Sequence, residues 1–373
     1  MSEVVLIGAG FVADLYMRSF ALYPEVKIRA VWDRDPARLE AFCTHWSVPA
    51  ASSLEAALTE GSAGCIVLNL TNPASHFDVS TAALTAGHHV YSEKPLGLSM
   101  AQAQALHDQA ADAGLLLSSA PCSVLGEAAQ TLIKAVRDEV CGIPRLVYAE
   151  LDDGFIPQAR YGDWLSDSGA PWPARDEFEV GCTLEHAGYY LTWLIAAFGP
   201  VARVVAASAA VIPDKEGNPE TPDVSVATLF FASGMVARLT CSIVAPHDHQ
   251  IRVIGDAGVI ELKQAWDNDA KPRFRKRVTI RRRLMELPVG RKLKIAGPTH
   301  PKVKRWGAAA MNFALGPMEM LEAIEAGRPC RLSSDFALHL NEVTLAIQNA
   351  GDTSGAQDMQ TRCDAMEPMP WAR

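Results

Sequence analysis

The chain has 373 residues, 49% of them apolar, and a formal net charge of −9. That length predicts two domains, and the negative charge argues against a protein that binds nucleic acid over its whole surface. The eight cysteines show no C-x-x-C spacing, which indicates free thiols in a reducing compartment and neither disulfides nor a zinc site. No apolar run reaches the roughly 18 residues of a membrane span, and no signal peptide is recognisable. We therefore expect a cytoplasmic protein that does not enter a membrane.

Residues 1–121 alternate between short apolar, β-branched runs and helical segments. We expect strands at 4–10, 26–32, 65–70, 88–92 and 115–120, and helices at 11–23, from 35 onward, and at 54–58, 75–86 and 99–114. Ser99 and Gln102 form a predicted capping box, and Gly87 and Gly114 are placed to end two helices. Strand–helix alternation of this kind predicts an α/β domain, a doubly wound parallel sheet with helices on both faces.

The pattern changes after residue 121, because strand-like runs follow one another closely. They lie at 202–212, 225–233, 235–244, 251–255 and 258–263, with helical segments at 181–194, 316–327 and 336–350. This predicts a second domain at 122–350, of the α+β class, with a largely antiparallel open sheet. Residues 351–373 are expected to form a loose C-terminal tail.

A glycine-rich turn between the first strand and the first helix indicates a dinucleotide site. Its pattern, G-x-G-x-x-A, is formed by Gly8, Gly10 and Ala13, with Phe11 and Val12 between them. The glycines allow a tight turn and close approach to a pyrophosphate, and the helix N-terminus adds amide donors. This predicts binding of NAD or NADP.

The choice between the two cofactors rests on the end of the second strand. Asp33 stands where a carboxylate accepts hydrogen bonds from the ribose hydroxyls and repels a 2′-phosphate, which favours NAD. Arg34 next to it leaves NADP open, because an arginine can hold that phosphate or stack on adenine.

Three stretches carry a family resemblance: VLIGAGFVA, TNPASH (71–76) and GHHVYSEKPLGLS (87–99). With these the chain resembles the glucose–fructose oxidoreductase/inositol dehydrogenase (Gfo/Idh/MocA-like) family over nearly its whole length. The resemblance implies an N-terminal Rossmann domain and a C-terminal domain whose open sheet forms the substrate wall and often a subunit interface. It implies hydride transfer between a nicotinamide and a sugar or cyclitol carbon, in a homo-oligomer such as a dimer or tetramer.

The resemblance also assigns roles to individual residues. Lys94, in the triplet Glu93-Lys94-Pro95, would lie beside the nicotinamide and the reacting hydroxyl, where an ammonium stabilises the developing alkoxide. Pro95 would fix the loop, with a cis bond as one option. The nicotinamide-ribose edge would be lined by Thr71, Asn72, Pro73 and His76.

The segment GCTLEHAGYYLTWL departs from the pattern G-x-x-x-D-x-G-x-H that the resemblance implies. Glu185 falls on the family Asp and Tyr189 on the family His, and both share one face of an α-helix, while His186 lies on the next face. Tyr189 has an ordinary pKa near 10 and needs a cation such as Lys94 to lower it. Four alternatives stay open for proton transfer: Tyr189 tuned by Lys94 and positioned by Glu185, His186 in its place, Lys94 alone, or none of the helix side chains. In the last case Glu185, His186, Tyr189 and Tyr190 are packing residues.

Candidate substrate residues precede that helix. The resemblance places substrate loops here, and the indoles of Trp164 and Trp172 suit the C–H faces of a sugar. Tyr161 belongs to the same stretch, and Asp153, Arg175 or Asp176 could bond hydroxyls. His247-Asp248-His249 lacks further ligands at useful spacing, so no metal is expected.

Residues 271–305 are strongly basic, with fourteen Lys or Arg against one acid. They fit a solvated loop, a contact with the acidic body of a neighbouring subunit, a nucleic-acid patch, or an anion site for a phosphorylated or nucleotide-linked substrate; nucleic acid is not expected.

The favoured function is an NAD(P)-dependent oxidoreductase acting on a carbohydrate or polyol. The alternatives are an NAD-dependent, redox-assisted glycosidase and a non-catalytic NAD-binding sensor or scaffold.

Overall fold

The computed structural model describes residues 2–305 and 307–373; Met1, at the start of the predicted first domain, and Trp306 lie outside the described residues. The N-terminal sheet is parallel throughout, in the order β2-β1-β3-β4-β5. Its strands are β1 (Glu3–Ile7), β2 (Lys27–Trp32), β3 (Ile66–Asn69), β4 (His89–Ser92) and β5 (Leu117–Ser119). The helices between them are α1 (Phe11–Phe20), α2 (Pro36–Trp46), α3 (Leu54–Glu60), α4 (His76–Thr85) and α5 (Met100–Ala113).

Alternation along β1 explains why both faces of this sheet are covered. Val4 and Leu6 pack in one apolar cluster with α1 and α2, whereas Val5 and Ile7 pack in another with α3, α4 and α5. Such a strand is buried on both sides, as its continuous apolar run requires. The doubly wound parallel sheet predicted from the sequence is confirmed, as is the cap of Ser99 on α5.

The C-terminal sheet contains ten strands within the described residues, in the order β13-β12-β11-β10-β6-β9-β8-β7-β15, with β14 paired to β12. Every pairing is antiparallel except β6 with β9, so the predicted antiparallel character is confirmed. The strands are β6 (Pro144–Asp152), β7 (Val201–Ala209), β8 (Val224–Phe231), β9 (Val236–Ser242), β10 (Ile251–Gly255), β11 (Gly258–Leu262), β12 (Arg273–Ile280), β13 (Arg283–Glu286), β14 (Arg291–Lys292) and β15 (Gln357–Asp358).

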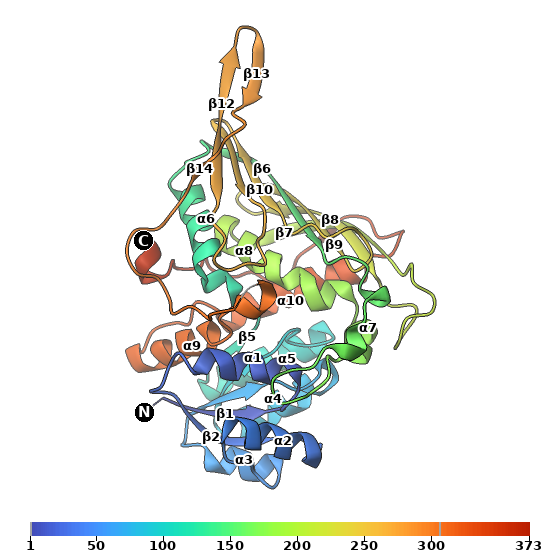
Figure 1. Ribbon diagram of the computed structural model, residues 1–373, viewed down its shortest axis with the longest axis vertical. Helices are drawn as coiled ribbons and strands as arrows, with labels where there is room; N and C mark the ends of the chain where they lie inside the picture. Colours follow the sequence, from blue (N-terminus) through green and yellow to red (C-terminus); the bar gives the residue numbers. More distant parts are fainter. Residues whose placement is uncertain (1, 306) are drawn as a thin grey trace.

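Helices cover one face of this sheet and separate it from the N-terminal domain (Figure 1). The helices of this part of the chain are α6 (Glu127–Arg137), α7 (Ala174–Val180), α8 (Gly188–Phe198), α9 (Leu315–Ala326) and α10 (Ser334–Gln348). Of these, α6 and α10 contact strands of the C-terminal sheet, whereas α9 contacts β3 of the N-terminal sheet. Ala337 and Leu338 of α10 belong to the same apolar cluster as α5, so this helix joins the two domains. Single turns complete the chain: η1 (Pro73–Ser75), η2 (Ser123–Leu125), η3 (Ile156–Gln158), η4 (Tyr161–Asp163), η5 (Thr183–Ala187), η6 (Gly307–Ala310) and η7 (Pro370–Ala372).

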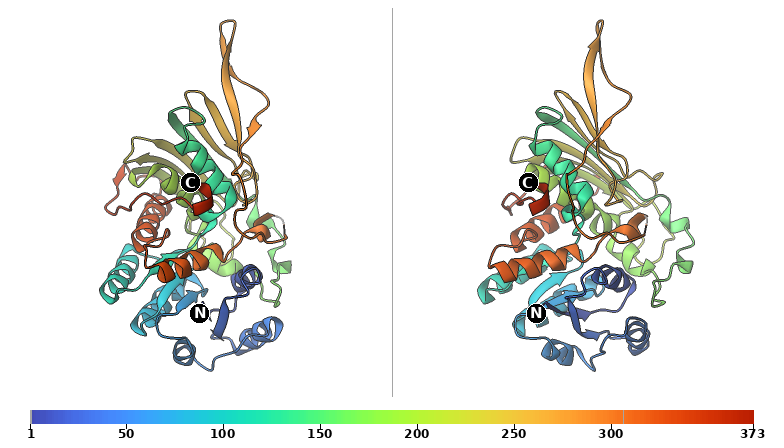
Figure 2. Two further views of the ribbon diagram at one scale, coloured as in Figure 1. Left: turned by 90° about the vertical axis from the view of Figure 1, so that its left-hand side faces the viewer. Right: turned by 60° about the vertical axis from the view of Figure 1, so that its left-hand side comes forward.

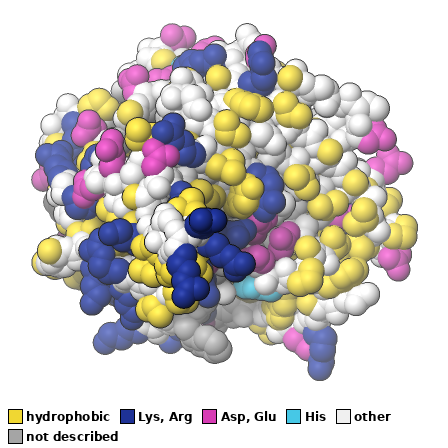
Figure 3. Space-filling view, turned by 90° about the horizontal axis from the view of Figure 1, so that it is seen from above, with side chains coloured by type: hydrophobic (Ala, Val, Ile, Leu, Met, Phe, Trp, Pro, Cys, Tyr) yellow, Lys and Arg dark blue, Asp and Glu magenta, His cyan; other side chains and the backbone are white. Residues whose placement is uncertain are grey.

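The basic segment is a β-hairpin that projects beyond the sheet, and we call β12, β13 and the turn between them the arm (Figures 1 and 2). Its turn holds Arg281 in the left-handed region, with φ +59°. Seen from above, Lys and Arg side chains gather around the arm together with apolar ones (Figure 3). The exposed apolar side chains of this region are Ile280, Leu284, Met285, Leu287 and Val289.

The C-terminal segment is packed, which corrects the expectation of a loose tail. β15 pairs with β7, and Met359, Cys363 and Met369 are buried in the main core. Its apolar residues are too widely spaced to form a local pattern, so their burial was not visible in the sequence. The eight cysteines are all free and buried, as predicted. Of the helices in residues 2–305 and 307–373, none has the length and apolar character to cross a bilayer.

Candidate active site

A cleft of about 620 Å³ opens at the carboxyl ends of the N-terminal strands. Gly8, Gly10, Phe11 and Val12 line it at the start of α1. Gly8 has φ +104°, and a Cβ there would stand 2.5 Å from the carbonyl oxygen of Leu70, so only glycine fits. A Cβ on Gly10 would meet nothing within 4 Å. This open space beside a helix N-terminus is the shape that a pyrophosphate needs.

Asp33 follows β2 and lines the far end of the same cleft. Its carboxylate accepts hydrogen bonds from the backbone N–H of Ala9 and of Asp35, both at 2.8 Å, and from Arg38 at 3.2 Å. Arg34 and Arg38 line this end as well. Asp33 therefore lies in the cleft as expected, and its role in binding the ribose stays a prediction. Arg38 was not predicted as a residue of this site. Its position in the first turn of α2, directly after the strand that ends before Asp33, could have indicated it.

Some of the residues predicted to bind the nicotinamide end of the cofactor line the cleft, and others lie behind its wall. Thr71, Asn72, Pro73, Glu93 and Lys94 line the cleft. Two expectations are corrected: His76 and Ala13 are 1% and 0% exposed and do not line it. The ring nitrogens of His76 lie 2.8 Å from the Pro95 carbonyl oxygen and 3.0 Å from that of Thr71, because the ring fills the space between the two loops. The Lys94–Pro95 peptide is cis.

The segment that replaces the family helix pattern begins with the π-helical turn η5 and continues as α8. A π turn changes the order in which side chains face outward. As a result Glu185, His186 and Tyr189 all line the cleft, whereas an α-helix would have turned His186 to a neighbouring face. Tyr190 is 1% exposed and belongs to the core.

Lys94 and Glu185 form an ion pair at the wall of the cleft, with their side chains 18% and 4% exposed. Glu177 of α7 is close to both. Burial and the charge of Glu177 raise the pKa of Glu185 to about 8, although Lys94 opposes this. Burial also opposes charge on Lys94, but Glu185 and Glu177 outweigh it and raise the Lys94 pKa. The pair therefore holds one cation beside a carboxyl that changes its protonation near neutral pH.

Tyr189 differs from the expectation in its pKa. Burial raises the pKa of Tyr189 well above its ordinary value, and the opposing effect of Lys94 does not compensate. Lys94 does lower the pKa of Tyr189, as expected, but burial, helped by the charges of Glu93 and Glu177, outweighs it, so the expected net lowering is wrong. Tyr189 stays a neutral phenol, packed at 4.5 Å between ring centroids against Trp266.

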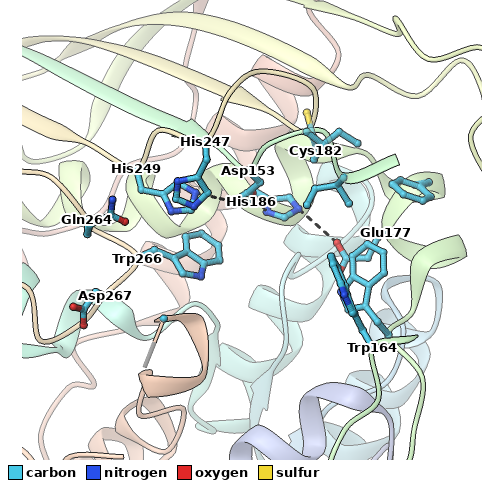
Figure 4. A pocket seen from close by; sticks show the side chains of 15 residues that line it. Asp153, Trp164, Glu177, Cys182, His186, His247, His249, Gln264, Trp266 and Asp267 are labelled. Atoms are coloured by element: carbon cyan, nitrogen blue, oxygen red, sulfur yellow. Dashed lines mark hydrogen bonds and ion pairs between the residues drawn. The ribbon is translucent and has the colours of Figure 1, made fainter. Parts of the chain in front are cut away.

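A second cavity of about 380 Å³ continues from the cleft (Figure 4). Trp172, Glu177, His186 and Trp266 line both spaces. The smaller cavity is further lined by Asp153, Trp164, His247, His249, Gln264 and Asp267. Asp153, Trp164 and Trp172 were predicted here from the sequence. Glu177, Trp266 and Asp267 were not, because their positions depend on how loops from distant parts of the chain meet.

Two predicted substrate residues do not line either cavity. Arg175 is an exposed side chain that pairs with Glu179 at 2.9 Å, since one turn of α7 points it to solvent. Tyr161 packs behind the cavity wall against Trp172 and Phe178, with ring centroids 5.7 and 5.6 Å away. Both expectations are corrected.

The remaining candidates concern ions. The described residues contain no group of three or more His, Cys, Asp or Glu that could hold a metal. None of the described Lys or Arg residues in 271–305 lines either cavity, so the structure does not support the anion-site interpretation of that segment.

The family comparisons fit this arrangement. Residues 2–120 match the family described as "Oxidoreductase family, NAD-binding Rossmann fold", and residues 129–261 match the "GFO/IDH/MocA C-terminal domain". The trans-1,2-dihydrobenzene-1,2-diol dehydrogenase of Sus scrofa is 23% identical over 260 residues, 69% of this chain and 72% of that protein.

Solved structures share the fold over almost the whole chain. The UDP-N-acetylglucosamine 3-dehydrogenase GnnA from Acidithiobacillus ferrooxidans aligns with TM-score 0.70 and 20% identity, covering 94% of this chain and 97% of the other. The WlbA dehydrogenase from Bordetella pertussis, solved with NADH and UDP-GlcNAcA, aligns with TM-score 0.72 and 18% identity, covering 95% and 98%.

Proposed function

The chain belongs to the GFO/IDH/MocA oxidoreductase family with an NAD-binding Rossmann domain, and we propose that it oxidises or reduces a CH–OH carbon of a sugar, sugar derivative or cyclitol with NAD. The observation that carries the proposal is the Lys94–Glu185 pair in the cofactor cleft, at the point where the second cavity begins. When bound, the nicotinamide supplies the hydride acceptor or donor.

The two members of the pair have different tasks in this proposal. The Lys94 ammonium contacts the substrate oxygen and stabilises the negative charge that develops on it. The Glu185 carboxylate accepts the hydroxyl proton during oxidation and returns it during reduction. Tyr189 remains protonated, positions the substrate oxygen as a hydrogen-bond donor, and packs against the wall.

The composition of the second cavity supports a polyol substrate. Three indoles, from Trp164, Trp172 and Trp266, offer flat apolar surface, while carboxylates and imidazoles offer hydrogen-bond partners. No Lys or Arg lines this cavity in the part of the chain that the structure describes. Although burial opposes it, Asp153 and Glu177 raise the pKa of His186 in the cavity wall, and both carboxylates lie beside that imidazole. A vicinal diol in a ring matches the trans-diol substrate in the name of the Sus scrofa relative.

The test is a screen of neutral sugars, cyclitols and cyclic diols with NAD⁺, followed by measurement of NADH. Accumulation of NADH with at least one of them, absent in Lys94→Met, supports the proposal. Release of an aglycone from glycosides without NADH accumulation would instead indicate the redox-assisted glycosidase. Tight NADH binding with no turnover of any compound would indicate the sensor.

We also propose that the protein is a homo-oligomer and that the arm contacts the acidic body of a second copy. Segment 271–305 carries a formal charge of +13 and the remainder of the chain −22, and Val205, Val226 and Phe230 are exposed on the sheet. Replacing Arg281, Arg282 and Arg283 together by Glu should shift the sedimentation equilibrium toward monomer, whereas Arg160→Glu should not. An unchanged assembly would contradict this contact.

The cytoplasmic location stays a prediction from the sequence.

A further inference from the structure

A short hairpin between β6 and α7 lies against helix α1, and we call its residues, 164–172, the docking hairpin. Its two ends are joined, because the backbone N–H of Trp172 donates a hydrogen bond to the carbonyl oxygen of Trp164 at 2.9 Å. Next to this bond, Leu165 and Pro171 pair across an antiparallel bridge. The hairpin therefore has a defined backbone of its own.

The two ends of the docking hairpin form part of the wall of both cavities. Leu165, Ser166 and Pro171 line the cofactor cleft. Trp164 lines the second cavity, and Trp172 lines both spaces (Figure 4). The two indoles pack on each other, with ring centroids 5.2 Å apart. The place of the hairpin thus sets the place of both indoles and of one side of the cofactor cleft.

The tip of the docking hairpin binds a buried carboxylate of α1. Asp14 is 0% exposed, and it accepts hydrogen bonds from the hydroxyl of Ser168 at 2.8 Å and from the Ser168 backbone N–H at 3.2 Å. The indole N–H of Trp46, at the end of α2, donates to the same carboxylate at 2.6 Å. Burying a carboxylate is costly unless donors satisfy it, so much of what stabilises Asp14 depends on the docked hairpin.

One turn further along α1, Arg18 pairs with Asp167 of the hairpin. Nη2 of Arg18 lies 2.6 Å from Oδ1 of Asp167, and Nε of Arg18 bonds the other oxygen. Two parallel hydrogen bonds of this kind make the strongest arginine–carboxylate contact. The side chains are 20% and 28% exposed. Asp167 and its neighbour Ser168 line neither cavity, so their contacts hold the hairpin on the helix without touching cofactor or substrate.

We propose that Asp14 and Arg18 are positioning residues, which dock the hairpin on α1 so that it holds Trp164 and Trp172 in the substrate wall and covers the bound cofactor. The inference rests on the proposed function for the class of substrate. Helix α1 begins at the glycine turn that is predicted to bind the pyrophosphate. The helix that holds the cofactor then also holds part of the substrate wall.

Docking affects binding and leaves the chemical step alone. Undocking widens the cofactor cleft on the side of the hairpin, so NADH leaves faster. It also displaces the indoles, so the substrate binds more weakly. Lys94 and Glu185 belong neither to the hairpin nor to α1, and the reacting groups therefore stay in place.

The test is a double variant, Asp167→Ala with Ser168→Ala, which removes the contacts to α1 and no residue that lines a cavity. Its NADH dissociation rate, followed by stopped-flow displacement, should rise about tenfold because charge-assisted hydrogen bonds are lost. The KM of the polyol should rise about tenfold with kcat changed less than about threefold, the mark of lost binding and intact chemistry.

Asp163→Ala is the matched control, because Asp163 lies just before the hairpin and pairs with the exposed Arg160 at 2.9 Å. It should change neither the NADH dissociation rate nor KM. An unchanged dissociation rate or an unchanged KM in the double variant would overturn the proposal, and so would a loss of kcat at constant KM.

A second measurement needs neither cofactor nor turnover. The indole N–H NMR signals of Trp46, Trp164 and Trp172 should shift in the double variant, whereas the signal of Trp193, which is 1% exposed in the core, should not. Unshifted signals of the first three would overturn the docking even if hydride transfer is established. Conversely, failure to reduce NAD⁺ with any polyol would refute the proposed function, while NADH release and the indole signals would still decide whether the hairpin is docked.

Discussion

Replacing Glu185 by Gln removes the charge that stabilises the Lys94 ammonium while keeping the shape of the side chain. The two groups are in contact and largely buried. Two unit charges about 4 Å apart interact by about 4 kcal/mol at an effective dielectric constant of about 20, which corresponds to about three pKa units. We therefore expect the pKa of Lys94 to fall by about three units, and kcat to fall about 10²-fold because the proton acceptor is lost.

The pH profile gives the sharper readout. Burial raises the pKa of Glu185 to about 8, and alcohol oxidation requires its ionised form, so kcat for oxidation should rise as the pH passes through about 8. Carbonyl reduction requires the protonated form, so its kcat should fall over the same range. Glu185→Gln should remove this inflection in both directions.

The assay is steady-state NADH formation and consumption from pH 6 to 10 in a constant-ionic-strength buffer, a range chosen to span about two units on either side of that inflection. Glu179→Gln is the matched control, because Glu179 lies on the same short helix as Glu177, pairs with the exposed Arg175, and does not line either cavity. An inflection near 8 that persists in Glu185→Gln would refute the reasoning, as would its loss in the control.

Four further outcomes are expected. Lys94→Met should lower kcat about 10³-fold with NADH affinity changed less than about threefold, since the ammonium acts on the developing charge. Tyr189→Phe should lower kcat less than about tenfold without moving the pH profile, because the phenol stays neutral. Asp33→Ser should raise kcat/KM for NADP⁺ relative to NAD⁺ at least about tenfold. Gly8→Ala should lower the melting temperature, because its Cβ meets backbone at 2.5 Å, whereas Gly10→Ala should leave it unchanged and weaken NADH binding.

Each of these has a result that would contradict it. Near-normal turnover in the Lys94 variant would remove that residue from the chemistry, and a Tyr189→Phe enzyme slower by 10²-fold or more would restore the tyrosine as the proton-transfer group. An unchanged cofactor preference after Asp33→Ser would mean that the ribose end is read by other groups. Equal melting temperatures and equal NADH affinities for the two glycine variants would show that neither the backbone contact nor the open space matters.

The sequence by itself determined the cofactor half of the site. Gly8, Gly10 and Asp33 lie within one strand–turn–helix unit and the strand that follows it, so their predicted cofactor roles follow from short spacings. The predicted role of Lys94 came from the family resemblance of the triplet Glu93-Lys94-Pro95. The sequence also predicted both sheets. Strands alternate with helices in the first domain and follow one another directly in the second, and the spacing of apolar residues shows whether a strand is buried on one face or on both.

The tertiary structure decided the catalytic half. Glu177 and Lys94 are separated by 83 positions yet lie together, and the π turn at Thr183–Ala187 brings His186 onto the same wall as Glu185. Neither arrangement could be predicted from neighbouring residues in the sequence, because each depends on the packing of α7 and η5 against the N-terminal domain. The same reason accounts for Arg175 and Tyr161 lying outside the cavities and for the C-terminal segment being packed. Spacing along the chain placed the groups that are predicted to hold the cofactor, whereas long-range packing set the charges around Glu185, the proposed proton acceptor.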